Sequence, residues 1–207
     1  MTANKQGFEP KTKFKMGGIR WTIIETEEEW VKCLASEIVE ERAFDAQNRN
    51  DFGISDLREY LNGEFFEKLT AAGAPEEAFG YFDIDLTADD GLNNYARDRV
   101  RIGFITCEEY RRLRGNIPPV DGWWWTATPD SPINSFVRYV SSDGTLSYYF
   151  AYYGYIGVRP LCILKSSILV SYLKGEAEDR AQAVDMMKHI AAAWNIKPEE
   201  IFDGSEV

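Results

Sequence analysis

Positive charge is scarce in this sequence: 23 Lys and Arg stand against 34 Asp and Glu, which gives a net charge of −11. A protein that binds nucleic acid needs a basic footprint to displace the counterions of the phosphates. The Lys and Arg residues form no such stripe, so we do not expect nucleic acid to be a partner.

Cysteine and histidine are also rare. Cys33, Cys107 and Cys162 each lie in an apolar setting without C-x-x-C spacing, which predicts reduced, buried thiols and neither a disulfide framework nor a zinc site. The single histidine, His189, falls on the polar side of a predicted helix with no Cys or His beside it. We therefore expect no metal and no cofactor.

Long apolar runs and catalytic motifs are missing as well. No run approaches the roughly 20 apolar residues of a membrane span, and the first ten residues lack the apolar core of a signal peptide. We expect a location in the cytoplasm or on a virion. The sequence has no P-loop, no nucleophile elbow and no recognisable His/Cys or carboxylate pair. It predicts that the protein is not an enzyme.

An acidic stretch between residues 83 and 90 superficially resembles a calcium loop. It offers four carboxylates, but Ala88 stands where an EF-hand needs glycine, and no glutamate closes the loop. A solvated connection is the better interpretation. The aspartates concerned are Asp83, Asp85, Asp89 and Asp90.

What the sequence has in abundance is tyrosine, concentrated between Trp123 and Leu164. Both ends of this stretch are apolar, but residues 147–155 read Ser-Tyr-Tyr-Phe-Ala-Tyr-Tyr-Gly-Tyr. Tyrosine diluted with Ser and Gly is typical of binding loops. Aromatic residues also suit strands, but successive side chains of a strand point to opposite faces, and one face usually meets water. Exposed aromatic clusters usually mark a partner.

A β-hairpin is predicted inside this stretch. Strands over residues 136–141 and 145–150 are joined at Asp143-Gly144, a strong turn signal. A two-residue turn would pair Val140 with Ser147, whereas a three-residue loop with left-handed Gly144 would pair Val140 with Leu146. We favour the second register.

The remaining pattern predicts a mixture of strands and helices. Residues 19–24 and 30–39 form a hairpin, and Ser55 caps a helix that continues through Gly63 to Leu69. Thr106 and Glu109 form a capping box for a helix ending at Leu113. Further strands are expected over 81–86 and 100–105, and after a break at Gly175 a helix over 176–195.

Several of these segments resemble known families. Trp123–Trp125, the 137–146 hairpin and Gly157-Val158-Arg159-Pro160 are similar to the C-terminal signature of variable proteins diversified by retroelements. Ser55-Asp56-Leu57-Arg58 resembles the first framework helix of a bacterial and phage domain family with a similar ending. The resemblance implies an α+β, C-type-lectin-like fold with antiparallel sheets, two or more flanking helices and long irregular loops. It would occupy residues 1–170, with a variable region at about 123–164 and a helical extension over 171–207.

The resemblance also implies a function, namely display of a diversified surface that binds a protein or another cell-surface ligand, with a homo-oligomer possible. Adenine mutagenesis of Asn codons cannot produce Trp, Met, Glu, Lys or Gln, and none of these occurs in residues 129–156. The implied ligand-binding residues are Asn134, Phe136, Arg138, Ser147, Tyr148, Tyr149, Phe150, Tyr152, Tyr153 and Tyr155.

Other interpretations remain open. The domain could be a non-diversified carbohydrate-binding or cell-wall-binding module, or an assembly protein with an aromatic subunit interface. Trp123–Trp125 could stack on sugars, although the resemblance makes them framework, and Arg159 is expected to be a buried, paired scaffold residue. Formylglycine-generating enzymes share the implied fold, but the closely placed cysteine pair on which they rely is not evident in the sequence.

Overall fold

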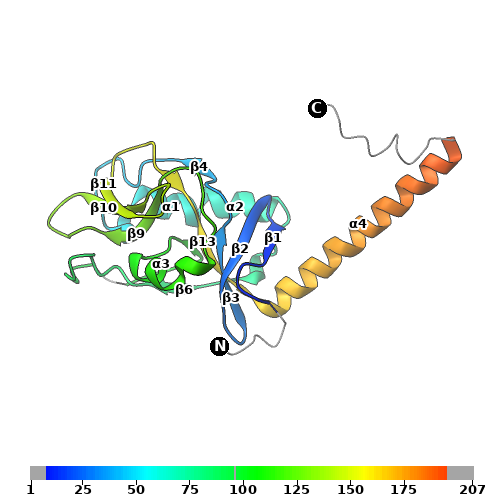
Figure 1. Cartoon of the computed structure of the whole chain (residues 1–207), viewed down its shortest axis with the longest axis horizontal. Coiled ribbons are helices and arrows are strands. Elements are labelled where there is room, and N and C mark those ends of the chain that lie inside the picture. Colours follow the sequence, from blue (N-terminus) through cyan, green and yellow to red (C-terminus); the bar gives the residue numbers. More distant parts are fainter. Residues whose placement is uncertain (1–7, 96, 195–207) are drawn as a thin grey trace. The chain divides into compact units, whose positions relative to one another are not determined.

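The computed structural model describes residues 8–95 and 97–194 and shows an α+β protein (Figure 1). The strands are β1 (Lys13–Met16), β2 (Ile19–Thr26), β3 (Trp30–Ala35), β4 (Glu40–Glu41), β5 (Phe79–Gly80), β6 (Phe82–Ile84), β7 (Asp98–Val100), β8 (Ile102–Gly103), β9 (Trp124–Pro129), β10 (Phe136–Val140), β11 (Leu146–Phe150), β12 (Gly157–Val158) and β13 (Leu161–Lys165). The helices are α1 (Asp56–Asn62), α2 (Glu64–Ala71), α3 (Cys107–Leu113) and α4 (Ser166–Trp194), with short 3-10 turns η1 (Phe52–Ile54), η2 (Glu76–Ala78) and η3 (Arg114–Asn116).

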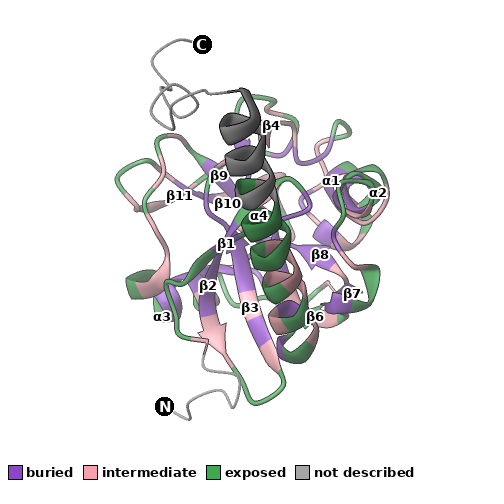
Figure 2. Cartoon of the chain, turned by 90° about the vertical axis from the view of Figure 1, so that its right-hand side faces the viewer, coloured by how far each residue is buried: buried purple, intermediate pink, exposed green. Residues whose placement is uncertain are grey.

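Two larger sheets organise the domain. In the first, the strand order is β1-β2-β3-β13-β5, with β8 also pairing with β13. In the second, the order is β11-β10-β9-β12-β4, and a small third sheet joins β6 to β7. Strand β13 pairs antiparallel with β3, so the end of the domain is bonded to its beginning. Buried residues run along the middle of β2 and β3 (purple in Figure 2).

The core that unites these elements is apolar and aromatic. Ile24, Leu34, Ile105, Tyr110, Leu113, Trp124, Val140 and Leu161 form one buried cluster. It joins the first sheet, the second sheet and α3. Since β9 and β10 contribute to it, the second sheet is a fixed part of the domain. The segments that emerge from this sheet therefore start from a rigid base.

The N-terminal hairpin expected from the sequence is confirmed, with differences at its ends. β2 and β3 pair antiparallel with Thr22 opposite Leu34, but β3 ends at Ala35 and does not reach Val39. The strand β1 precedes the hairpin and pairs with β2. It was not predicted because its four residues lie next to a Gly-Gly turn and are too few to show a period.

The prediction of one helix from Ser55 to Leu69 was wrong. Ser55 does cap α1 by accepting a hydrogen bond from the Arg58 N–H at 3.2 Å. Gly63 then ends α1 with φ −109° and ψ −104°, and α2 begins at Glu64. Glycine costs a helix about 1 kcal/mol relative to alanine, so the break occurs where the helix is weakest.

Two other local predictions are confirmed. The capping box of α3 is present, with Thr106 accepting from the Glu109 N–H and Glu109 accepting from the Thr106 N–H. In the β10–β11 hairpin Val140 pairs with Leu146, and Gly144 has the left-handed φ of 79° that the three-residue loop requires.

The chain divides into two compact units after Ser167. The boundary expected at residue 170 therefore lies inside α4. Gly175 does not break this helix, contrary to the prediction, because a single glycine costs only about 1 kcal/mol within a long helix. The side chains of Met187, His189, Ile190 and Trp194 lie outside the described residues. No helix in the described residues is long and apolar enough to cross a membrane.

Candidate functional site: an exposed aromatic surface

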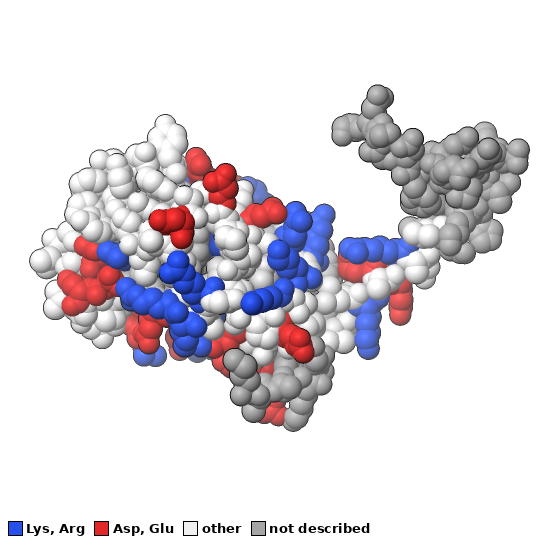
Figure 3. Space-filling model, viewed as in Figure 1, with Lys and Arg blue, Asp and Glu red and all other residues white. Residues whose placement is uncertain are grey.

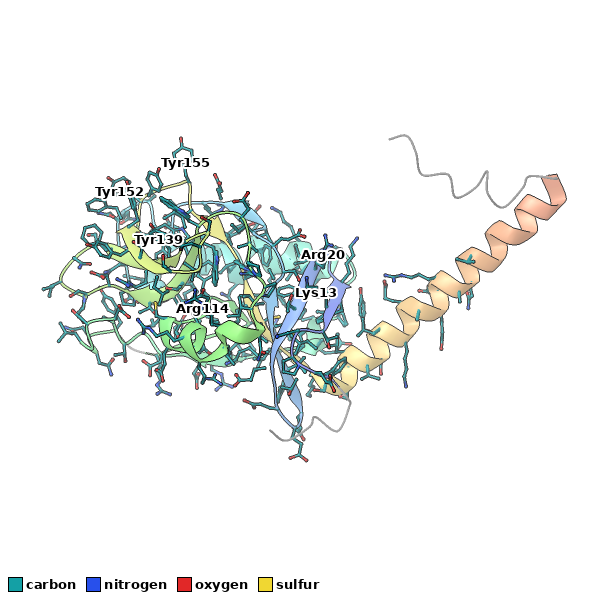
Figure 4. The ribbon with its side chains drawn as sticks, in the orientation of Figure 1. Lys13, Arg20, Arg114, Tyr139, Tyr152 and Tyr155 are labelled. Carbon is teal, nitrogen blue, oxygen red and sulfur yellow. The ribbon has the colours of Figure 1, made fainter. Side chains whose placement is uncertain are left out.

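Seven aromatic side chains from β10, β11 and the loop after β11 form a surface that we call the aromatic surface. Five of them are clearly exposed: Tyr155 by 72%, Tyr152 by 52%, Tyr148 by 49%, Phe150 by 39% and Tyr149 by 36%. Phe136 and Tyr153 are half-buried beneath them. Tyr152 and Tyr155 point outward from the ribbon in Figure 4.

The rings of the aromatic surface contact one another. The Phe136 centroid lies 5.1 Å from that of Tyr148 and 4.5 Å from that of Phe150. Phe150 in turn stacks on Tyr152 at 5.4 Å. On the other side of β11, Tyr149 lies 4.4 Å from Tyr153, which is 5.4 Å from Tyr155. The Tyr149–Phe150 contact at 6.2 Å joins the two groups. The result is one continuous apolar patch with tyrosine hydroxyl groups distributed over it.

β11 also carries unpaired backbone groups, because it is the edge strand of its sheet. Ser141 donates its N–H to the Thr145 carbonyl at 2.9 Å, and Ala151 donates to Ser135 at 3.0 Å. Antiparallel hydrogen bonds alternate along a strand. The N–H and C=O groups of Leu146 and Tyr148 therefore point away from β10. Edge strands are commonly protected by lysine, proline or a bulge, and Leu-Ser-Tyr-Tyr-Phe has none of these.

The segment that carries most of the aromatic surface has no charged residue. Residues 144–158 include no Asp, Glu, Lys or Arg, and the surface at the upper left of Figure 3, over β11 and the following loop, is white. Charged side chains lie over the remainder of the same face. A partner that met residues 146–155 would therefore desolvate no ionised side chain of that segment, which lowers the cost of contact.

The segment between β4 and η1 holds the aromatic loop in place. Asp45 is fully buried, and its carboxylate accepts hydrogen bonds from the N–H groups of Gln47 and Arg49, each at 3.0 Å, and from the Arg49 guanidinium. The Asp45 N–H donates to the Ala151 carbonyl at 3.0 Å. Ala151 is itself buried, so the backbone beneath Tyr152 is fixed. The sequence predicted no functional role for this segment, although the i,i+4 spacing of Asp45 and Arg49 was a visible signal.

The three non-aromatic residues among the ten predicted ligand-binding residues do not lie freely on the surface. The Arg138 guanidinium pairs with Asp130 at 3.1 Å and with Asp89 at 3.4 Å, and lies under the Tyr148 ring. Asn134 bonds to Asp130 and to the Phe136 N–H, each at 2.9 Å. Ser147 is half-buried opposite Tyr139. The Arg138 guanidinium is therefore engaged in ion pairs within the fold.

Two aspartates of the acidic stretch, Asp85 and Asp89, form ion pairs within the fold. Asp89 also pairs with Arg111 at 2.7 Å, and Asp85 with Arg97 at 3.2 Å. Among the described residues no three His, Cys, Asp or Glu side chains are grouped so that they could hold a metal ion.

The three consecutive tryptophans differ in burial. Trp124 and Trp125 are buried framework, as predicted, but Trp123 is 42% exposed. Its ring stacks on Tyr139 with centroids 5.1 Å apart. The difference follows from position, since β9, which is buried along its whole length, begins only at Trp124.

A cysteine pair that the sequence did not reveal lies in the first sheet. Cys33 on β3 is directly opposite Cys162 on β13, and both thiols are free and fully buried. Burial, together with the neighbouring Cys33, raises the pKa of Cys162 well above its ordinary value. A reactive cysteine needs a lowered pKa and access to solvent, and Cys162 has neither.

The turn that precedes the aromatic surface gives a pH-dependent prediction. The Ser141 hydroxyl and the Thr145 N–H donate hydrogen bonds to the Asp143 carboxylate and lower its pKa from 3.8 to about 2. A lowered pKa adds stability above pH 3.8 that is lost as the pH falls towards 2. The stability difference between the wild type and Asp143→Asn should therefore shrink over this interval in denaturant titrations. A difference that stays constant would show that the carboxylate is not held in this way.

Comparison with known proteins bears on the second half of the domain. Residues 78–166 match the profile of a domain of unknown function (DUF6273). No curated protein and no solved structure matches the chain. The matched region begins in η2 and ends where α4 begins, so it includes the aromatic surface, the three tryptophans and Arg159.

Proposed function

We propose that this protein binds a macromolecular ligand, a protein target, through the aromatic surface, on a C-type-lectin-like scaffold whose variable region is diversified by a retroelement. The observation that carries the proposal is the exposure of five contacting aromatic side chains on a fixed backbone. Aromatic anchors contribute most of the binding energy at protein interfaces. A rigid site also loses less conformational entropy on binding.

Two further features support a contact site that tolerates sequence change. The exposed rings pack on each other and not in the core, so another residue type at these positions leaves the buried framework intact. The backbone beneath them is held by β10 and by Asp45, independently of the side chains displayed. The C-type-lectin-like scaffold is supported by the pairing of β3 with β13 and by the helices α1, α2 and α3 around the sheets.

One observation favours a second candidate function, a non-diversified carbohydrate-binding or cell-wall-binding module. The exposed Trp123 ring on Tyr139 offers a flat face of the kind that stacks on sugars. Sibling copies of the gene separate the two candidates. Differences confined to template adenines within residues 123–164, beside a reverse transcriptase gene, would support diversification. An aromatic surface that never varies would contradict it.

A randomised library tests the binding scaffold directly. With the exposed positions 148, 149, 150, 152 and 155 varied together, we expect most clones to fold, and selection against three purified, immobilised globular proteins to yield binders to at least one. Folding is measured by protease resistance and binding by titration. The reason is that these side chains contribute little buried area to the core.

The matched control is a library that varies five buried positions of the same region. Trp125, Val137, Ala151, Ile156 and Val158 are each fully buried or nearly so. Most clones of this library should lose protease resistance. Equal losses of protease resistance in the two libraries would show that the aromatic residues belong to the core, and the proposed function would then be wrong.

A further inference from the structure

A second site lies apart from the aromatic surface. A pocket of about 150 Å³ is bounded by α3 and η3, by the Pro118-Pro119 segment and by the turn between β10 and β11. Its polar lining includes two arginines, Arg114 and Arg159, and the residues Ser141 and Ser142. Tyr110 and Trp124 supply aromatic walls. Figure 4 labels Arg114 beside the end of α3.

Arg159 is a buried cation without a compensating anion. Its side chain is 1% exposed, yet it makes no ion pair within the described residues. Its Nε donates to the Ala35 carbonyl at 2.8 Å, and its Nη2 donates to the carbonyls of Ser36 at 3.3 Å and Pro118 at 3.0 Å. The Trp124 ring lies 4.8 Å from the guanidinium carbon. Arg159 is thus buried and has partners, as expected, but all of these partners are neutral groups.

The remaining donors of Arg159 are available to the pocket. A guanidinium has five N–H groups, and three of them are used by the carbonyls. The two on Nη1 have no acceptor within the described part of the chain, while Arg159 lines the pocket. Burial lowers the pKa of Arg159 to about 10, so the group is still charged at neutral pH. A buried charge without a counter-charge is costly, and an anion in the pocket would remove that cost.

Arg114 provides a second cation at the rim. It is exposed, makes no salt bridge within residues 8–95 and 97–194, and lies over the Tyr110 ring at 5.7 Å. The carboxylate that lines the pocket, Asp143, is committed to the turn through its bonds to Thr145 at 2.9 and 2.7 Å. Two positive groups against one engaged carboxylate leave the lining with an excess of positive charge.

We propose that this pocket binds a single small oxyanion, a carboxylate or a phosphate group, between Nη1 of Arg159 and the guanidinium of Arg114. A cavity of about 150 Å³ holds a molecule the size of benzene, which is ample for such a group. Arginine recognises both anions through paired N–H donors. The anion is held either as a free ion or as the C-terminal carboxylate of a peptide, and the same chemistry recognises both.

The test is an NMR titration of the full chain with inorganic phosphate, and with acetate, against chloride at constant ionic strength. We expect saturable shifts of the Tyr110 and Trp124 side-chain signals. Affinity should fall at least tenfold in Arg114→Gln and stay unchanged in Arg97→Gln, which removes an exposed arginine outside the pocket. Since Arg159→Met can fail to fold, Arg114→Gln is the deciding variant.

A short peptide with a free C-terminus, compared with its amidated form, distinguishes the two sources. If the free peptide binds more tightly than phosphate and amidation abolishes its binding, the site is assigned to a peptide carboxylate. If phosphate binds more tightly than the peptide, the site is assigned to the free ion. Chemical-shift changes that never saturate, or equal losses of affinity in Arg114→Gln and Arg97→Gln, would overturn the proposal. The aromatic surface does not contribute to this pocket, so the outcome is independent of the proposed function.

Discussion

Replacing Asp45 with alanine is expected to lower the free energy of unfolding by about 3 kcal/mol. The buried carboxylate accepts hydrogen bonds from three backbone N–H groups, those of Gln47, Arg49 and Asp56, and from the Arg49 guanidinium, and its loss would leave the backbone donors without this partner. The same change should loosen the aromatic loop, since the Asp45 N–H anchors Ala151. Denaturant titration measures the first effect, and hydrogen exchange at Ala151–Tyr153 measures the second.

The control for this variant is Asp56→Ala. Asp56 also meets Arg49, at 3.5 Å, and accepts a hydrogen bond from the Ala46 N–H at 2.8 Å, but its carboxylate is 47% exposed. Exposed ion pairs contribute about 0–1 kcal/mol, so the loss of stability should be several-fold smaller. Burial raises the pKa of Asp45, but the hydrogen bonds from Arg49 outweigh it and leave the pKa below 3.8. The effect of Asp45→Ala should therefore diminish as the pH falls below that value. An equal loss in both variants would contradict the role given to the buried carboxylate.

Replacing Trp125 with alanine is expected to be the most destabilising change in the tryptophan series, at about 3–5 kcal/mol. Its ring is fully buried and meets the Phe44 ring edge-on at 5.7 Å. Its indole N–H donates to the Arg42 carbonyl at 2.9 Å, which would lose its partner. The cavity and the unpaired carbonyl act in the same direction. Chemical denaturation of the purified variant measures the loss.

Trp123→Ala is the matched control two residues away. Because the Trp123 ring is 42% exposed, its removal should cost less than about 1 kcal/mol. The comparison of these two variants also bears on the function. If Trp123→Ala abolishes binding to a polysaccharide without loss of stability, the carbohydrate-binding candidate gains. Similar destabilisation by both changes would mean that Trp123 is framework, as the sequence resemblance implied.

The hairpin beneath the aromatic surface could be predicted in detail because its signals are local. Asp143-Gly144 determines the turn, the left-handed Gly144 determines the register, and the register places Val140 and Leu146 together. The capping box of α3 was predictable for the same reason, since Thr106 and Glu109 are three residues apart. Gly63 shows the limit of such reasoning, because a glycine can either be carried within a helix or end it.

The sites themselves depend on contacts between distant parts of the chain. Neither the pairing of Arg138 with Asp89 nor the alignment of Cys33 with Cys162 has any signature in local spacing. The same is true of the support that Asp45 gives to Ala151. Packing and charge pairing over such separations arise only when the sheets assemble.

The sequence by itself determined the local elements, the uncharged character of residues 144–158 and the concentration of tyrosine there. The tertiary structure alone decided which of those rings face solvent and that Arg159 is buried against neutral carbonyls. The physical reason is the separation along the chain over which each interaction acts. Turn and capping preferences act over a few residues and can be read from spacing, whereas burial depends on which strands become neighbours.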